Sequence, residues 1–201
     1  MMTSGGARRG RRHRAQVALD ALGGPQDRLL VAPLDVRSEE EARTAAAAAV
    51  ETFGRIDVLV NNAGRGLFGA VEQTTLDDAR TLFDTNVLGV LAVTRAVLPV
   101  MRAQRSGRIV MMSSMGGFSS GAGFGMYAAD YLAAADAVEQ YEDGDPPGDT
   151  EAVAAAVLDV ADQPHPPLRL PIGEDAVSPI RAKADAVLAG LRGSEWAQPG
   201  R

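Results

Sequence analysis

The chain has 201 residues, of which 46% are hydrophobic, so it is long and apolar enough for one domain with a packed core. Its net charge of −6 and its pI near 5.0 argue against general nucleic-acid binding, and the lack of cysteine excludes disulfides and thiolate sites. The two histidines, His13 and His165, have no acidic partner at metal-ligand spacing, so we expect no metal site.

No apolar run approaches the ~20 residues that a membrane-spanning helix needs. The basic stretch 7–14 is followed only by a short apolar segment that carries Asp20, which is not the pattern of an export signal. We therefore expect a cytoplasmic protein without a membrane partner.

Residues 1–27 are rich in Gly and Arg and show no strand pattern, which predicts a disordered arm. The arginines leave a second interpretation open, in which this arm binds nucleic acid. Residues 28–192 are expected to form a single domain, with a linker at 141–150, and residues 193–201 are expected to form a loose tail.

Strand patterns alternate with helix patterns from residue 28 onwards. Three apolar segments have the length of strands, at 28–36, 56–64 and 108–114. A helix is predicted to begin at Ser38, which forms a capping box with Glu41, and to end at Gly54. A long helix pattern covers 75–107, and a further helix covers 126–140.

Apolar strands that alternate with helices are typical of a parallel sheet with helices on both faces. After the linker, the pattern continues with a helix at 150–163, a Pro-flanked edge strand at 164–173 and a last helix at 174–193. The predicted fold class is α/β, a reduced Rossmann-like, doubly wound sheet of about four mostly parallel strands.

Polar and small residues follow the predicted strands at their carboxyl ends, where ligands bind in such folds. Asp35 and Val36 end the first strand, residues 61–64 end the second, and Ser113 and Ser114 end the third. The sequence therefore predicts a site along this edge of the sheet.

Five motifs occur in a distinctive order along the chain. They are "LDV" at 34–36, "NNAG" at 61–64, "NVLG" at 86–89, "GRIVMMSS" at 107–114, and Tyr127, which lies 13 residues after Ser114. Together they resemble the short-chain dehydrogenase/reductase (SDR) family, continuously from about Arg28 to Ala129 and again from about Gly148 to Arg192.

The resemblance implies a catalytic set of three residues. Tyr127 would donate or accept the proton of the substrate oxygen, Ser114 would hydrogen-bond that oxygen, and Asn86 would hold a water in the proton relay. The implied reaction is hydride transfer between a nicotinamide cofactor and a small alcohol or carbonyl substrate.

The resemblance also implies a cofactor site. Asp35 and Val36 would contact the adenine, while Asn62, Ala63 and Gly64 would lie along the ribose. The cofactor would be NAD or NADP, and no motif in this chain chooses between them.

The family motif Tyr-x-x-x-Lys is incomplete, because Tyr131 stands where the family has lysine. Residues i and i+4 share a helix face, so the lysine ammonium would favour the phenolate and lower a tyrosine pKa from about 10. Tyr131 carries no charge, and a nearby Asp130 carboxylate would oppose such a shift.

Two further elements of the family are absent from the sequence. The glycines at 3–10 follow no apolar strand, so the glycine turn that holds the pyrophosphate is not formed as the family forms it. The core strand and covering loop that follow the tyrosine helix in the family are replaced by the linker 141–150.

The sequence thus predicts an SDR oxidoreductase by descent whose own activity is impaired or lost. One alternative is a non-catalytic protein that associates with a complete family member, or with a second copy, through the long helix 75–103 and the Tyr127 helix. Another is a truncated or frameshifted reading frame. The segment 61–71 loosely resembles family members that act on steroid-like or retinoid-like alcohols.

Overall fold

The computed structural model describes residues 28–67, 71–114 and 149–192. The predicted arm at 1–27, the helix at 126–140 with Tyr127 and Tyr131, most of the linker and the tail at 193–201 lie outside these residues. The chain divides into two compact units, and each is described by itself. The described part of the first unit comprises residues 28–64 and 83–109, and the second unit comprises the other described residues.

Helix α2 (Glu39–Phe53) confirms the helix predicted between the first two strand patterns. The Ser38 hydroxyl accepts from the Glu41 N–H at 3.2 Å, and Gly54 ends the helix in the left-handed conformation at φ 77°. The other half of the predicted capping box is replaced, because the Glu41 carboxylate accepts from the Asp35 N–H at 2.7 Å. The Ser38 N–H donates instead to the Asp35 carbonyl at 2.9 Å.

The long helix predicted at 75–107 consists of α3 (Leu76–Phe83), the π-helical turn η2 (Asp84–Leu88) and α4 (Gly89–Gln104). A short 3₁₀ turn, η1 (Val71–Gln73), precedes it. Hydrophobic periodicity predicted the helix but not its π turn, since one extra residue in a turn leaves the apolar pattern almost unchanged.

The continuous helical run Leu76–Gln104 is long and apolar enough, by length and composition alone, to cross a membrane. Core helices of soluble proteins meet the same criterion, so the finding is weak evidence. It differs from the sequence expectation that no apolar run approaches the length of a membrane-spanning helix.

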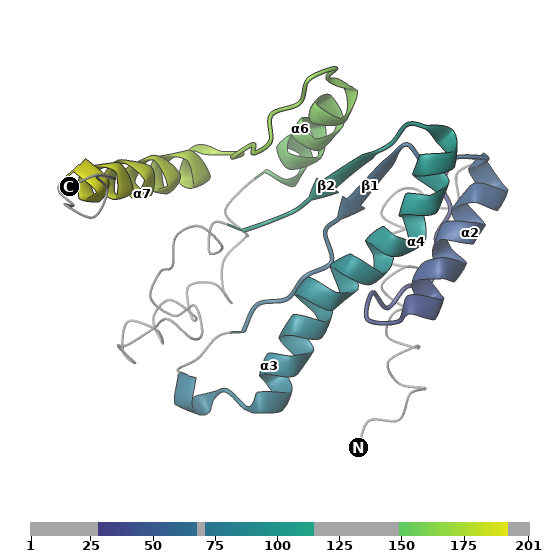
Figure 1. Cartoon of the computed structure of the whole chain (residues 1–201), viewed down its shortest axis with the longest axis horizontal. Helices are drawn as coiled ribbons and strands as arrows, with labels where there is room; N and C mark the ends of the chain where they lie inside the picture. Colours follow the sequence, from purple (N-terminus) through teal and green to yellow (C-terminus); the bar gives the residue numbers. More distant parts are fainter. Residues whose placement is uncertain (1–27, 68–70, 115–148, 193–201) are drawn as a thin grey trace, which may run out of the picture. The chain divides into compact units, whose positions relative to one another are not determined.

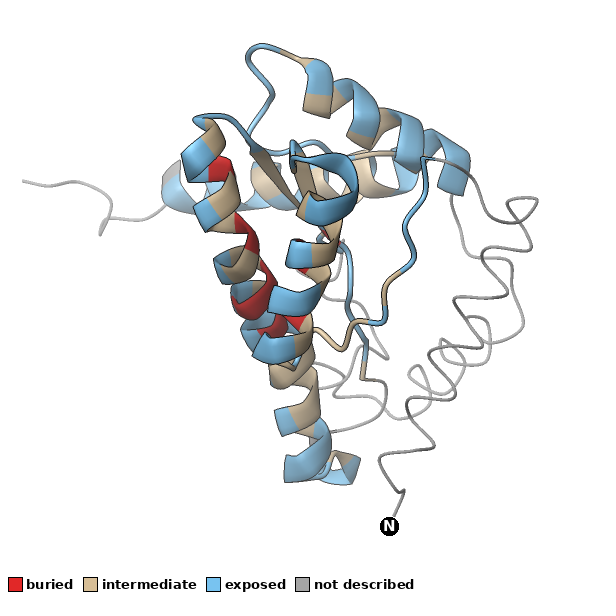
Figure 2. Cartoon of the chain, turned by 90° about the vertical axis from the view of Figure 1, so that its right-hand side faces the viewer, coloured by how far each residue is buried: buried red, intermediate tan, exposed pale blue. Residues whose placement is uncertain are grey.

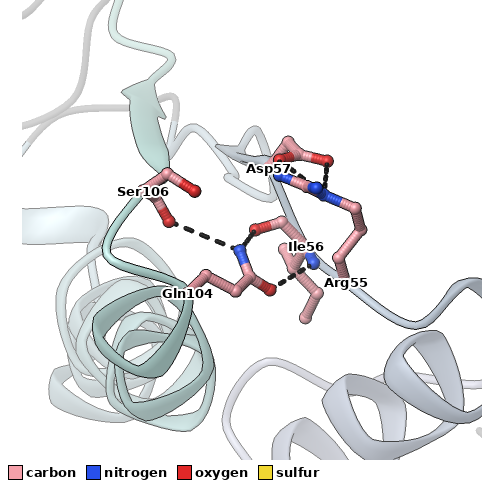
Figure 3. Close-up of polar contacts among 5 residues, drawn as sticks. All are labelled: Arg55, Ile56, Asp57, Gln104 and Ser106. Atoms are coloured by element: carbon pink, nitrogen blue, oxygen red, sulfur yellow. Dashed lines mark hydrogen bonds and ion pairs between the residues drawn. The ribbon is translucent and has the colours of Figure 1, made fainter.

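Strands β1 (Val58–Asn61) and β2 (Arg108–Met111) form a parallel two-stranded sheet (Figure 1). The Gln104 side chain at the end of α4 accepts from the Ile56 N–H at 2.9 Å and donates to the Ile56 carbonyl at 2.8 Å (Figure 3). The Arg108 N–H then donates to the Asp57 carbonyl at 2.8 Å. Gln104 therefore fixes the end of α4 beside the start of β1.

The core of the first unit lies between α2 and α4, which run side by side (Figures 1 and 2). Its buried cluster is formed by Ala46, Val97 and Met101. Partly buried side chains from the sheet and its approaches pack against this cluster, namely Ile56, Leu59 and Ile109. Helices α2 and α4 therefore cover one face of the sheet.

The two other predicted strands are not strands in this structure, which corrects the expected count among the described residues. Residues 28–36 have no assigned strand, and Pro33 within them lacks the N–H that a ladder requires. Residues 164–173 contain four prolines and are likewise irregular, with Leu168 93% exposed. A strand also needs a neighbouring strand to pair with. Among the described residues β1 and β2 pair with each other, and neither of the two irregular segments pairs with them.

The second unit contains two further helices, α6 (Thr150–Asp162) and α7 (Glu174–Arg192), as the sequence predicts. The Asp149 carboxylate caps α6 by accepting from the Glu151 N–H at 2.9 Å and the Ala152 N–H at 3.2 Å. No described side chain of α6 or α7 is buried.

Candidate cofactor and active site

The carboxyl end of β1 presents a short exposed segment. Asn61 is buried, at 9% exposure, and its side-chain amide donates to the Thr94 hydroxyl on α4 at 3.2 Å. The next three residues, Asn62, Ala63 and Gly64, are exposed. Asn61 therefore anchors the strand end to α4, and the predicted ribose-binding residues project beyond that anchor.

Asn86 lies within the π turn η2 and is exposed. A Cβ atom built on Gly64 would lie 3.6 Å from the Asn86 Oδ1 atom, so the structure brings these two predicted site residues together. A π turn redirects the side chains around it and leaves the regular backbone ladder, which is why such turns are frequent at functional sites.

Val36 packs against the start of α4. A Cβ atom built on Gly89 would lie 2.7 Å from the Val36 Cγ2 atom, closer than real contacts allow, and a tight 3.1 Å from the Val36 Cβ atom. The absence of a side chain at Gly89 therefore lets the Asp35–Val36 turn approach the helix. This contact joins two of the sequence motifs, "LDV" and "NVLG".

Asp35 is held by a network that sequence analysis did not anticipate. The Arg37 guanidinium donates from Nε to Asp35 Oδ1 at 3.0 Å and from a terminal nitrogen to Oδ2 at 2.8 Å, and the Arg37 N–H donates to Oδ1 at 3.1 Å. The Asp35 side chain is only 19% exposed. Arg37 thus binds the Asp35 carboxylate, and Glu41 binds the Asp35 backbone N–H.

The π turn also affects the pKa of Arg37. Its hydrogen bond to Asp35 and the charge of Asp35 raise the pKa of Arg37 above the ordinary value, and the charge of Asp84 adds to this effect. Arg37, Asp84 and Gly89 are the site residues that sequence reasoning missed. An Asp and an Arg two residues apart after a strand pattern were the available signal for Arg37.

The remaining predicted residues are not brought into this group by the described structure. Ser114 belongs to the second unit, is exposed and lies three residues after β2. Tyr127 lies outside the described residues. Within the described ranges, no group of three or more His, Cys, Asp or Glu side chains is placed to hold a metal ion.

An α/β domain with polar residues beyond the carboxyl ends of its strands is typical of Rossmann-like folds. The family model for short chain dehydrogenases matches residues 7–141, more than half of the chain. The chain therefore belongs to the short-chain dehydrogenase family, which confirms the resemblance seen in its motifs. The match begins at residue 7, within the stretch that the sequence predicts to be an arm.

A solved structure supports the same conclusion. A short-chain dehydrogenase from Streptomyces avermitilis superposes with a TM-score of 0.77 at 33% identity, covering 90% of this chain and 84% of that chain. The predicted Rossmann-like α/β fold class is thereby confirmed.

Curated relatives match about half of this chain. Estradiol 17-beta-dehydrogenase 1 of Rattus norvegicus is 46% identical over 100 residues, which cover 50% of this chain and 28% of that protein. An uncharacterized oxidoreductase of Schizosaccharomyces pombe is 41% identical over 91 residues, which cover 45% of this chain and 39% of that protein. The match thus spans well under half the length of either relative.

Members of this family generally bind NAD(P). The described residues fit the nucleoside part of such a ligand, since the partly exposed Asp35 carboxylate can accept from an exocyclic amine. The exposed segment Asn62–Gly64 has a small residue at two of its three positions, so a sugar can approach its backbone.

Proposed function

We propose that this chain is an NAD(P)-binding oxidoreductase domain for an alcohol/carbonyl pair, with an impaired proton-transfer step. The observation that supports it most directly is the juxtaposition of Gly64 and Asn86, where a Cβ atom built on Gly64 would lie 3.6 Å from Asn86 Oδ1, in the same unit as the Asp35–Val36 turn. Family membership supports the oxidoreductase class.

Each cofactor residue has a distinct task in this proposal. Asp35 accepts a hydrogen bond from the adenine amine, and Val36 provides an apolar contact to the ring. Asn62, Ala63 and Gly64 line the ribose. When bound, the nicotinamide supplies or accepts the hydride.

The protein's own chemistry concerns the proton on the substrate oxygen. Tyr127 donates its hydroxyl proton to the carbonyl oxygen during reduction and accepts a proton from the alcohol during oxidation. Ser114 donates a hydrogen bond to the same oxygen, and Asn86 holds a water that returns the proton.

Impairment follows from residue 131. A tyrosine without a nearby cation has a pKa of about 10, so little phenolate exists at neutral pH. Tyr131 also lacks the ammonium group that would donate to the ribose hydroxyls. Both binding and proton transfer are therefore weakened relative to a member that carries lysine.

A turnover assay tests this proposal. The purified chain is incubated with NAD(H) or NADP(H) and a panel of secondary alcohols and ketones, and absorbance of the reduced nicotinamide is followed. We expect turnover far below the ordinary range of roughly 1–10³ s⁻¹, and none in Tyr127→Phe. Tyr131→Lys alone is not expected to restore it, because the pyrophosphate turn is still incomplete. Turnover within the ordinary range would contradict the impairment.

A second candidate function is association with a complete family member or with a second copy. The observation that favours it is a row of exposed apolar side chains on η2 and the adjoining turns of α3 and α4. Their exposures are 56% for Phe83, 51% for Val87, 54% for Leu88 and 51% for Leu91. Size-exclusion chromatography with light scattering tests it, and we expect Val87→Glu to abolish any dimer. A monomer at every concentration, with no co-purifying family member, would exclude this candidate.

A further inference from the structure

The Asp35 carboxylate is held by a guanidinium fork, as is the Asp57 carboxylate beside Arg55, but the Asp35 side chain is the less exposed of the two, at 19% against 54%. Arg37 contributes three hydrogen bonds to the Asp35 carboxylate, at 2.8, 3.0 and 3.1 Å, and two of them come from the rigid guanidinium fork. A forked pair fixes the plane of a carboxylate as well as its distance, which a single hydrogen bond does not.

The turn that carries this pair is itself anchored. Glu41 accepts from the Asp35 N–H at 2.7 Å, and Val36 lies against Gly89 at the start of α4. The Asp84 charge acts on Arg37 from the π turn. Arg37 therefore orients the carboxylate, Glu41 holds the backbone of the turn, and 19% of the Asp35 side chain remains accessible.

We propose that Arg37 is a specificity-determining positioning residue, which holds the Asp35 carboxylate so that the site prefers a 6-aminopurine nucleotide over a 6-oxopurine nucleotide. This inference rests on the proposed function, because it concerns the nucleoside end of the same cofactor site. Arg37 was not identified by any sequence motif. The purine preference can be measured by binding alone, without turnover.

The chemistry of the two purines explains the preference. The 6-amino group of adenine donates a hydrogen bond, which a carboxylate accepts with charge assistance. The 6-oxo group of hypoxanthine is an acceptor, so its oxygen would face the carboxylate without a proton between them. A carboxylate that rotates freely can turn away from the oxo group, whereas one held by Arg37 cannot. The discrimination therefore depends on Arg37 as well as on Asp35.

The experiment compares two probes, NADH and reduced nicotinamide hypoxanthine dinucleotide, which differ in the group at purine position 6 and in the proton that hypoxanthine carries on N1. Their dissociation constants are measured by isothermal titration calorimetry for the full chain and for Arg37→Ala, Arg37→Lys and Arg43→Ala. Arg43 is the matched control, since it is exposed on α2 and pairs with Glu40 at 2.6 Å. Circular dichroism melts establish that each variant is folded.

We expect the unmodified chain to bind NADH about tenfold more tightly than the hypoxanthine analogue, as one charge-assisted hydrogen bond allows. Arg37→Ala should reduce this ratio to about threefold or less. Arg37→Lys should reduce it as well, because an ammonium group is a point charge without the fork. Arg43→Ala should leave the ratio unchanged.

The outcomes separate this inference from the proposed function. If the unmodified chain binds neither probe, the proposed cofactor site is wrong and the role of Arg37 fails with it. If it binds both probes equally, or if Arg37→Ala keeps the full ratio, the cofactor site stands and the role of Arg37 is overturned. If Arg37→Ala does not fold, the ratio of the two dissociation constants for Arg37→Lys tests the role of Arg37.

Discussion

The helix pair α2 and α4 and the helix pair α6 and α7 were equally predictable from sequence, yet they differ in what surrounds them. All six buried hydrophobic residues within the described ranges lie on α2 and α4: Ala42, Ala46, Ala92, Val93, Val97 and Met101. In α6 and α7, apolar side chains such as Leu158 and Leu191 are 68% and 55% exposed.

This difference shows that helix formation and site formation have separate causes. Helices α6 and α7 begin at their predicted residues although none of their described side chains is buried, and intrinsic propensity, with the Asp149 cap of α6, favours them. The predicted site residues Asp35, Gly64 and Asn86 all lie in the unit that has the core. Packing against α4 places those residues together, and propensity alone does not.

The largest expected effect comes from removing a core side chain. Met101 is 6% exposed and contacts the cluster between α2 and α4, so Met101→Ala should lower the free energy of unfolding by about 2–5 kcal/mol. Leu191→Ala in α7 is the control, and it should change this free energy by less than about 0.5 kcal/mol. Urea denaturation followed by circular dichroism measures both, and equal losses would contradict the contrast between the two pairs.

A glycine-to-alanine substitution should have opposite signs in the two regions. In α4, a Cβ on Gly89 would overlap Val36, so Gly89→Ala should destabilise by about 1–3 kcal/mol. In α7, a Cβ on Gly190 meets nothing within 4 Å, so Gly190→Ala should stabilise that helix by up to about 1 kcal/mol.

A double-mutant cycle identifies the atom responsible at Gly89. Val36→Ala removes the Cγ2 methyl group, the nearest atom that a Cβ on Gly89 would meet, so the double variant should be less destabilised than the sum of the single variants. Strict additivity would show that Val36 is not the neighbour that excludes a side chain at Gly89.

The smallest expected effects concern the helix caps. Ser38→Ala and Asp149→Ala each remove side-chain acceptors from the first turn of a helix, at about 1 kcal/mol per cap. The Ser38 effect should appear in the cooperative unfolding transition, because α2 packs against α4. The Asp149 effect should appear as lost helical signal below that transition. A cooperative loss for both variants would mean that α6 shares a core that the described residues do not show.

Sequence reasoning located the helices because their signals are local. Ser38 and Gly54 bracket α2, and the acidic and apolar pattern of α7 lies within one element. Strands depend on a partner that the pattern does not name, which is why 56–64 and 108–114 contain β1 and β2 while 28–36 and 164–173 contain no strand. The prolines at positions 33, 164, 166, 167 and 171 were the sequence signal against a strand in these two segments.

The site was partly predictable for the same reason. The motifs placed Asn86 in the long helix and Gly64 at the end of the second strand segment, beyond which β1 itself stops at Asn61, and the structure brings the two residues together. The Arg37 fork and the Val36–Gly89 contact depend on side-chain orientation and on the approach of α4, neither of which a motif encodes. The sequence pattern did not reveal the π turn that carries Asn86, because a π turn shifts the hydrophobic periodicity by only a fraction of a helical turn.

We propose that this chain retains a dinucleotide site on its packed unit. Thermal unfolding of the purified chain with and without millimolar NAD(H) and NADP(H) tests it most directly, because a ligand that binds the native state raises its stability by mass action. A ligand at a hundred times its dissociation constant adds about 2.7 kcal/mol. We predict a cooperative transition whose midpoint rises with at least one of these cofactors. A cooperative transition that none of them shifts would contradict the claim.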